Sequence, residues 1–375
     1  MARQASVRIQ DHFQHLTDPR RRRVVYPLIN IVTIAVCAVL CGADDFVSIA
    51  EFGRNRRAWL ATFLDLSTGI PSHDRFNAVF GALKPAEFER CLLSWITDLH
   101  EISDGQIVAL DGKTLRRSFD AATSKSAIHM VSAWATANCV TLGQVVVDEK
   151  SNEITAIPKL LQMLELSGCL VTIDAMGCQV EIAHTIVAQK ADYVLAVKGN
   201  QPTLHNGIVG FFLDQLEDEF AREKVSIQRK KEKGHGRQEM REYFVCAVPE
   251  TLPDRERWPN LQAIGMAITY VTRQGKETSD VRYYILSKKL SAKRFGEAVR
   301  GHWGIENRLH WQLDVTFQED QSRLRKGHAD VNFSSLRRMA LSMLKNDRTL
   351  KVGVKNKRLA AAWNTDYLQQ VLFKT

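Results

Sequence analysis

Apolar positions recur at helical spacing along the first hundred residues. Between short polar breaks, this pattern predicts helices at 27–41, 48–64, 72–83 and 85–100. Ser72 is typical of a helix N-cap, and Pro85 of a first helical turn. Two short helices joined by a tight turn fit a DNA-reading helix-turn-helix, but plain helical packing explains the same pattern. The sequence leaves both interpretations open.

From residue 105 the apolar segments become short and strand-like. The pattern predicts strands at 105–111, 127–137, 140–147, 169–174 and 193–197, and helices at 154–166 and 179–189. Asn138 and Cys139 mark a hairpin turn between the second and third strands. Three hairpin-linked strands, followed by strands that are connected through helices, predict an α/β fold with a mixed sheet and helices on both faces.

Residues 200–289 interrupt this alternation. A helix is expected at 204–220, and strand-like segments at 242–248, 261–271 and 282–286 predict a mostly β insertion. The charged run at 229–241 fits either a solvated loop or a segment that follows a phosphate backbone. After it we expect a helix from Ser291 past Glu306, a polar segment at 319–326, and packing helices at 334–344 and 359–372.

Composition narrows the class of protein. With 375 residues, 45% of them hydrophobic and 25% charged, the chain is long enough for about two or three folded domains. A net charge of +9 suits a protein that lies against a polyanion, although it also suits a soluble protein without such a partner. The seven cysteines contain no C-x-x-C pair, so we expect small buried side chains rather than a disulfide framework or a zinc site.

One stretch raises the question of a membrane segment. Residues 24–43 carry no charge and directly follow four arginines, at 20–23, which resembles the flank of a signal or anchor. Pro27 and Asn30 interrupt the stretch, and its most apolar part is only ten residues long, 31–40. We therefore predict a buried core helix that begins near Pro27 and no membrane association.

Three carboxylates occupy positions that suit metal chemistry. Asp111 ends the apolar run 107–110, Asp174 ends the run 170–173, and Glu306 lies in the helix after the insertion. The predicted strand order places Asp111 beside Asp174, where two carboxylates repel each other unless a cation lies between them. Each acid taken alone is more often a turn or cap residue.

The chain has a family resemblance that rests on four blocks in order: IVALDGKTLRRS, VTIDAMGCQ, ADYVLAVKGNQ and HWGIENRLHWQLDVTFQED. The chain resembles the DDE transposases of bacterial insertion sequences, in the H-repeat-associated branch, and the resemblance extends to the blocks DPRRRRVVYPL and PSHDRFNAVF. It implies an RNase H-like catalytic domain at 101–199 and 290–345, with the β insertion at 200–289. It also implies a helical N-terminal domain at 1–100 that binds DNA ends, and leaves a helical tail at 346–375.

The resemblance implies Asp111, Asp174 and Glu306 as catalytic acids and metal ligands. They would hold two Mg²⁺ ions, or Mn²⁺, for DNA cleavage and strand transfer. The implied partners are the double-stranded element ends and target DNA, with a dimer assembled on DNA, in a cytoplasmic and nucleoid-associated protein. The wider group carries Tyr, Arg and Lys around its Glu, and the matching positions here are Val299, His302 and Leu313.

Several residues near the acids are candidates for binding DNA. Basic side chains at strand ends grip phosphate, and aromatic side chains stack on unpaired bases, although solvated turns and core packing explain the same residue types. His302, Glu306 and His310 recur every four residues on one helix, but the second ligand set of a zinc protease motif is missing. The candidate nucleic-acid-binding residues are Lys113, Arg116, Arg117, Lys198, His302, Trp303 and His310.

Two other functions share these features. A related nuclease would use the same three acids and cut nucleic acid without joining it. A decayed, non-catalytic DNA-binding protein would keep the basic charge and lose the chemistry. The three acids favour an enzyme over the second alternative, and only a joining assay separates a transposase from a nuclease.

Overall fold

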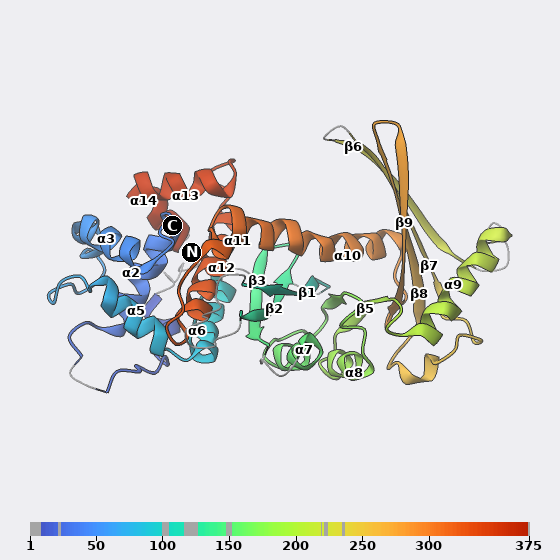
Figure 1. The fold of residues 1–375 in the computed structure, drawn as a ribbon, viewed down its shortest axis with the longest axis horizontal. Helices are drawn as coiled ribbons and strands as arrows, with labels where there is room; N and C mark the ends of the chain where they lie inside the picture. The colour runs from blue at the N-terminus through green and yellow to red at the C-terminus, as the bar shows by residue number, and fades with distance from the viewer. Residues whose placement is uncertain are drawn as a thin grey trace, which may run out of the picture.

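The computed structural model describes residues 9–21, 24–99, 105–115, 127–147, 152–218, 220, 224–234 and 237–373. Helices gather at one end of the molecule, strands form its middle, and a long twisted blade of strands stands at the other end (Figure 1). Both chain termini lie at the helical end. The single long helix that crosses the middle connects the blade to the helical end.

The helical end begins with the predicted N-terminal helices. They are α1 (Ile9–Phe13), α2 (Leu28–Leu40), α3 (Phe46–Asn55), α4 (Arg57–Leu60), α5 (His73–Ala82) and α6 (Pro85–Leu99). Ser72 caps α5, because its Oγ accepts a hydrogen bond from the Arg75 N–H at 3.3 Å. Every residue of α2 from Asn30 to Leu40 is buried, which confirms the predicted core helix. None of the described helices has the length and apolarity that crossing a membrane requires.

The C-terminal helices complete this helical end. They are α12 (Ala329–Asn346), α13 (Val354–Trp363) and α14 (Thr365–Phe373). The helix α12 packs against α2, α5 and α6. Its buried Asn332 donates hydrogen bonds from Nδ2 to the carbonyls of Phe80, at 2.7 Å, and Leu83, at 2.9 Å. The turn between α5 and α6 is therefore held from the far end of the chain, and α12 belongs by its contacts to the helical end.

A nine-stranded mixed sheet runs through the rest of the molecule, in the order β3-β2-β1-β4-β5-β9-β8-β7-β6. The first five strands are β1 (Ile107–Thr114), β2 (His129–Ala135), β3 (Val140–Val146), β4 (Leu170–Ile173) and β5 (Asp192–Val197). As the alternation of strands and helices predicts, β1 pairs antiparallel with β2 and parallel with β4, which pairs parallel with β5. The helices α7 (Glu153–Gln162) and α8 (Val180–Ala188) cover one face (Figure 1).

The segment between residues 200 and 289 continues this sheet. After α9 (Pro202–Glu217) come β6 (Ser226–Gly234), β7 (Arg237–Ala247), the short 3₁₀ turn η1 (Arg255–Arg257), β8 (Ala263–Arg273) and β9 (Lys276–Leu286). Antiparallel pairing of β9 with β5 joins these four strands, the blade, to the central strands. The β content is as predicted, but the segment shares one sheet with β1–β5.

The charged run 229–241 is ordered as strand rather than as the solvated loop that its composition allowed. Its residues, apart from 235 and 236, which lie outside the described ranges, belong to the antiparallel strands β6 and β7. Arg229 Nε lies 2.6 Å from Glu242 Oε1, and Arg241 Nη1 lies 2.5 Å from Glu232 Oε2. Opposite charges across the strands take the place of the apolar alternation that marks a strand in sequence.

The other face of the central sheet is crossed by a continuous helix. It consists of α10 (Ala292–Ile305), a π-helical turn labelled η2 (Glu306–His310), and α11 (Trp311–Val315), and it is followed by the 3₁₀ turn η3 (Glu319–Gln321). Ser291 caps α10, with its Oγ accepting from the Arg294 N–H at 3.2 Å, as the sequence predicts. Gly265 of β8 lies directly beneath the buried ring of Phe295, so α10 sits close against the sheet.

Candidate active site

Two of the three candidate acids lie at the same edge of the sheet. In the parallel pair of β1 and β4, Leu110 lies opposite Ile173, so the next residues in each strand are Asp111 and Asp174. β4 ends there, whereas β1 continues to Thr114 because β2 keeps pairing with it. The predicted neighbourhood of the first and fourth strands is therefore confirmed.

The Asp174 carboxylate is held by the turn that follows β4. Its Oδ1 accepts hydrogen bonds from the backbone N–H groups of Met176, at 3.1 Å, and Gly177, at 3.3 Å. These bonds fix the orientation of the side chain at the end of a rigid strand. One carboxylate oxygen is used in this way, whereas Oδ2 accepts no hydrogen bond from the described residues.

Glu306 lies where the α-helix changes into a π-helix. The π-helical turn from Glu306 to His310 contains one residue more than an α-helical turn, and such turns occur frequently at functional sites. It also breaks the four-residue repeat that places His302, Glu306 and His310 on one helix face. His302 Nδ1 lies 3.3 Å from Thr172 Oγ1 on β4, whereas His310 Nε2 lies 3.1 Å from Asp111 Oδ2 on β1.

The three acids line one cavity of about 330 Å³. Lys198, His302 and Trp303 line it as well, together with Arg282 of β9. As their side chains stand, the described residues contain no group of three His, Cys, Asp or Glu close enough to hold a metal ion. Carboxylates that face one cavity repel each other, and a bound cation would offset that repulsion. The donors on this cavity are hard oxygens, which suit Mg²⁺ or Mn²⁺.

Electrostatics in the cavity bear on His302. Burial lowers the pKa of the imidazole, although the charges of Asp111 and Asp174 oppose that effect. With Nδ1 3.3 Å from Thr172 Oγ1, His302 contributes a polar group to the lining of the cavity.

The other candidate DNA-binding residues occupy different environments. Lys198 is exposed at the end of β5. Trp303 is 42% exposed, and the guanidinium of Arg282 lies 3.8 Å from its ring centroid. Arg116 and Arg117 lie outside the described residues. The roles expected for these residues on DNA remain predictions.

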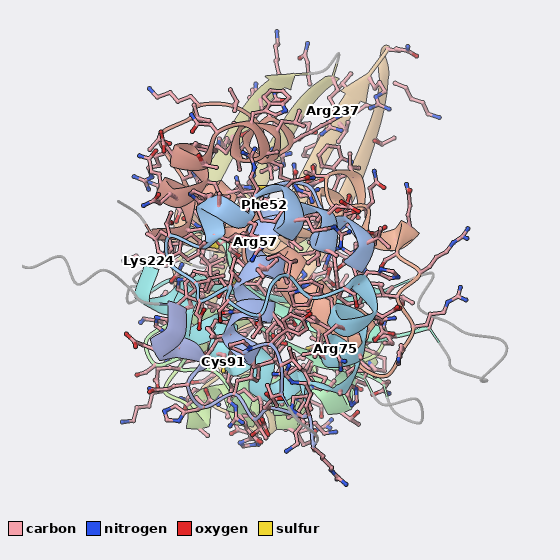
Figure 2. All side chains as sticks on the ribbon, turned by 90° about the vertical axis from the view of Figure 1, so that its left-hand side faces the viewer. Phe52, Arg57, Arg75, Cys91, Lys224 and Arg237 are labelled. Carbon is pink, nitrogen blue, oxygen red and sulfur yellow. The ribbon has the colours of Figure 1, made fainter. Side chains whose placement is uncertain are left out.

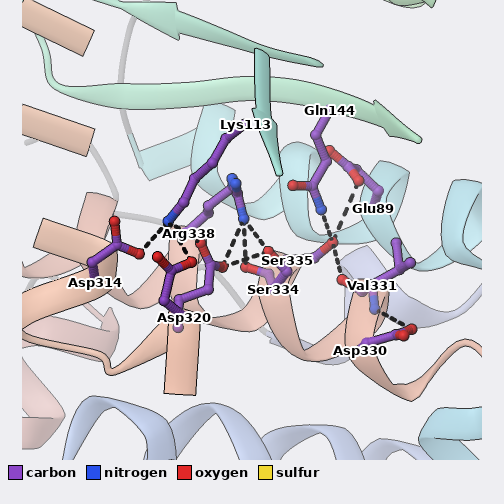
Figure 3. A network of polar contacts seen from close by, with 11 residues as sticks. Glu89, Lys113, Gln144, Asp314, Asp320, Asp330, Val331, Ser334, Ser335 and Arg338 are labelled. Carbon is purple, nitrogen blue, oxygen red and sulfur yellow. Dashed lines mark hydrogen bonds and ion pairs between the residues drawn. The ribbon is translucent and has the colours of Figure 1, made fainter. Parts of the chain in front are cut away.

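Lys113 is buried against three carboxylates, of which Glu319 is buried as well. It contacts Asp314 of α11, and its Nζ lies 3.0 Å from Glu319 Oε2 and 3.9 Å from Asp320 Oδ1 (Figure 3). The ammonium thus fastens the segment after the π-helical turn to the strand that carries Asp111. A phosphate that bound Lys113 would have to compete with these carboxylates.

Glu319 anchors a buried network that the sequence does not reveal. Ser334 Oγ donates to its Oε1 at 2.6 Å, and Arg338 Nη1 lies 3.1 Å from the same oxygen. Burial would raise the pKa of Glu319, but the charges of Arg338 and Lys113 outweigh burial and lower the pKa to about 2. Glu319 falls in the segment expected to be merely polar, because a paired buried acid leaves no trace in apolar periodicity.

Comparison with known proteins gives consistent matches over nearly the whole chain. The family described as "Transposase DDE domain" matches residues 102–343, and "DDE_Tnp_1-associated" matches residues 10–96. The chain is 43% identical to "Putative transposase YncI" of Escherichia coli O157:H7, over 96% of this chain and 93% of that protein. It is 40% identical to "H repeat-associated putative transposase YhhI" of Escherichia coli K12, over 97% of each chain.

Proposed function

The chain belongs to the DDE transposases, in the H-repeat-associated branch, and from this premise we propose that it binds the terminal inverted repeats of an insertion sequence and catalyses metal-dependent DNA cleavage and strand transfer. One observation carries the proposal: Asp111, Asp174 and Glu306, from three separate elements, line a single cavity. We further propose that β1–β5 with α10 form an RNase H-like core, which the strand order β3-β2-β1-β4-β5 supports.

The residues that line the cavity have different proposed roles in holding the metal ions and the phosphate. Asp111, Asp174 and Glu306 would be the ligands for two Mg²⁺ ions, or for Mn²⁺. When bound, these ions supply charge stabilisation at the attacking and leaving oxygens of an in-line displacement. The backbone N–H groups that hold Asp174 keep its remaining oxygen directed for a ligand. The exposed ammonium of Lys198 would draw a phosphate toward the acids.

The proposed partners are the double-stranded ends of the element and the target DNA. The net charge of +9 supports binding to such a polyanion through the release of its counterions. Because two ends must be joined to one target, we propose a dimer assembled on DNA, in a cytoplasmic and nucleoid-associated protein.

The proposal is tested with the inverted repeats that flank this gene. Labelled repeat ends are mixed with the protein and a plasmid target, with Mg²⁺ or with EDTA, and the products are separated by size. We expect cleaved ends and joined plasmid with Mg²⁺ and neither with EDTA. Cleavage without joined product would identify a nuclease instead, and binding without cleavage would identify a non-catalytic DNA-binding protein.

A further inference from the structure

A second, larger cavity adjoins the acidic one. This groove of about 920 Å³ lies between α10 and the blade formed by β6–β9. The two cavities share the lining residues Arg282, Val299 and Trp303, so they meet beside α10. A DNA strand whose backbone is cut at the three acids has this groove as an adjoining path.

Basic side chains outnumber acidic ones in the lining of the groove. They come from the blade and from the helix: Lys230, Arg237, Arg241, Arg282, Arg294, Arg300 and Arg308. The blade rises clear of the rest of the molecule in two perpendicular views, with Arg237 near its upper end (Figures 1 and 2). The groove is thus open to a long ligand, and its cations outnumber the lining acids Glu239, Asp280 and Glu297.

Three of the cations surround one carboxylate of the blade. Glu232 Oε1 lies 2.9 Å from Lys230 Nζ and 2.6 Å from Arg300 Nη1, and Oε2 lies 2.5 Å from Arg241 Nη1. Arg300 is on α10 and the other two are on the blade, so this contact ties the helix to the blade. An arrangement of two guanidinium groups and one ammonium around a single anion is the arrangement that also binds phosphate.

Pairing between β6 and β7 does not explain why the residue at position 232 is acidic. Glu232 lies directly opposite Glu239 across β6 and β7, where two like charges are unfavourable. Arg241 contacts both carboxylates and so offsets their repulsion. Glu232 is about one-third exposed, so an anion arriving from solvent can reach the cations that hold it.

We propose that Lys230, Arg241 and Arg300 form a binding site for a backbone phosphate of the DNA strand that leaves the acidic cavity, and that Glu232 occupies this site as an internal competitor while DNA is absent. The proposal rests on the proposed function only in taking DNA as the ligand. When DNA binds, a phosphate replaces the Glu232 carboxylate. Arg300 of α10 then loses its ion pair with the blade and pairs with the phosphate instead.

Fluorescence anisotropy measures the binding of a labelled repeat-end duplex at several salt concentrations. EDTA is present throughout, so that no DNA cleavage occurs and the assay tests binding alone. Glu232→Gln removes the competitor, so we expect about fivefold tighter binding and a salt slope steeper by about one. Arg300→Gln removes a cation and should weaken binding and reduce the slope by about one. The two substitutions act in opposite directions, so a general loss of folding cannot imitate both.

The chain offers matched controls on the same hairpin. Arg229 and Glu242 form an ion pair like that of Arg241 and Glu232, but adjacent strand residues face opposite sides of the sheet, so this pair lies away from the groove. Glu242→Gln and Arg229→Gln change the net charge equally and should leave the affinity within about twofold of wild type.

Equal effects of Glu232→Gln and Glu242→Gln would overturn the phosphate site, because net charge alone would then explain the change. This outcome is distinct from failure of the proposed function. If repeat ends are never cleaved but Glu232→Gln still tightens binding selectively, the groove stands and the transposase chemistry fails. If ends are cleaved and joined while the two Gln variants bind alike, the chemistry stands and the groove fails.

Discussion

His310 Nε2 lies 3.1 Å from Asp111 Oδ2, although His310 belongs to the π-helical turn and Asp111 to the central strand β1. A carboxylate only accepts hydrogen bonds, so the imidazole N–H donates and fixes the orientation of Asp111. Substitution of a partner that orients a metal ligand commonly lowers metal affinity by about 10–100-fold. The contact therefore makes His310 a positioning residue for the proposed metal site.

Calorimetric titration of the DNA-free protein with Mn²⁺ tests this role. His310→Ala should lower the affinity by about 10–100-fold, and His310→Gln, whose amide can still donate, should lose less. His184 is exposed on α8, so His184→Ala serves as the control and should bind Mn²⁺ like wild type. Unchanged affinity in His310→Ala would show that the contact does not orient a ligand.

Acid should weaken the buried network around Glu319. Its folded-state pKa of about 2 lies below the ordinary value of 4.5, so the carboxylate stabilises the fold above pH 4.5. This contribution, on the order of 3 kcal/mol, is lost as the pH falls from 4.5 toward 2. The difference in unfolding free energy between wild type and Glu319→Gln should therefore be large at pH 6 and shrink below pH 4.5.

Denaturant unfolding of both proteins at a series of pH values measures this difference. Glu165 is exposed, and Glu165→Gln should show no comparable pH dependence. A difference between wild type and Glu319→Gln that stays constant from pH 6 to pH 3 would contradict the account of Glu319 as a buried anion held by Lys113 and Arg338.

Asn332 is expected to stabilise the turn between α5 and α6. Asn332→Leu keeps the branching and the number of heavy atoms of the side chain but leaves the carbonyls of Phe80 and Leu83 without their buried donor, which costs about 1–3 kcal/mol. Asn346, on the same helix, donates to the Ser342 carbonyl of its own helix, and Asn346→Leu should cost less. Thermal unfolding compares the stability of the two variants. Equal losses of stability would contradict the role of Asn332 in holding the turn between α5 and α6.

Gly265 should be required for the close seat of α10 on the sheet. A Cβ at this position would lie 2.8 Å from the ring of the buried Phe295, so Gly265→Ala should cost about 1–3 kcal/mol of stability. Gly210 lies in α9 with open space around its Cβ position, and Gly210→Ala should stabilise the protein by up to about 1 kcal/mol. Thermal melts that show the same sign for both substitutions would contradict this packing argument.

The sequence predicts the elements whose patterns are local. Ser72 and Ser291 mark helix starts that the structure confirms, and the apolar runs before Asp111 and Asp174 become neighbouring parallel strands. Strand order follows from the alternation of strands and helices, because connections of this kind are short and of fixed hand. The pairing of Asp111 and Asp174 at one sheet edge is therefore within reach of the sequence.

The features that the sequence does not predict depend on distant partners. The strands β6 and β7 carry charges where apolar alternation would reveal a strand, and Glu232 is stabilised by Arg300, 68 residues away. The π-helical turn contains one extra residue, so His310 points in a different direction from His302 and Glu306. The four-residue repeat in the sequence predicts one shared helix face instead. The sequence predicts Lys113 to be a phosphate ligand. It does not reveal the partner Glu319, because that residue lies 206 residues further along the chain.

The central claim is that Asp111, Asp174 and Glu306 form one metal-dependent cleavage site. Cleavage rates of a labelled repeat end in Mg²⁺ should be compared for Asp111→Asn, Asp174→Asn, Glu306→Gln and Glu165→Gln, the last removing an exposed acid that lines neither the acidic cavity nor the groove. Metal ions supply several kcal/mol of charge stabilisation, so each of the first three variants should lose at least about 10³-fold in rate. Glu165→Gln should cleave within about twofold of wild type. Cleavage at the wild-type rate by any one of the first three variants would contradict the claim.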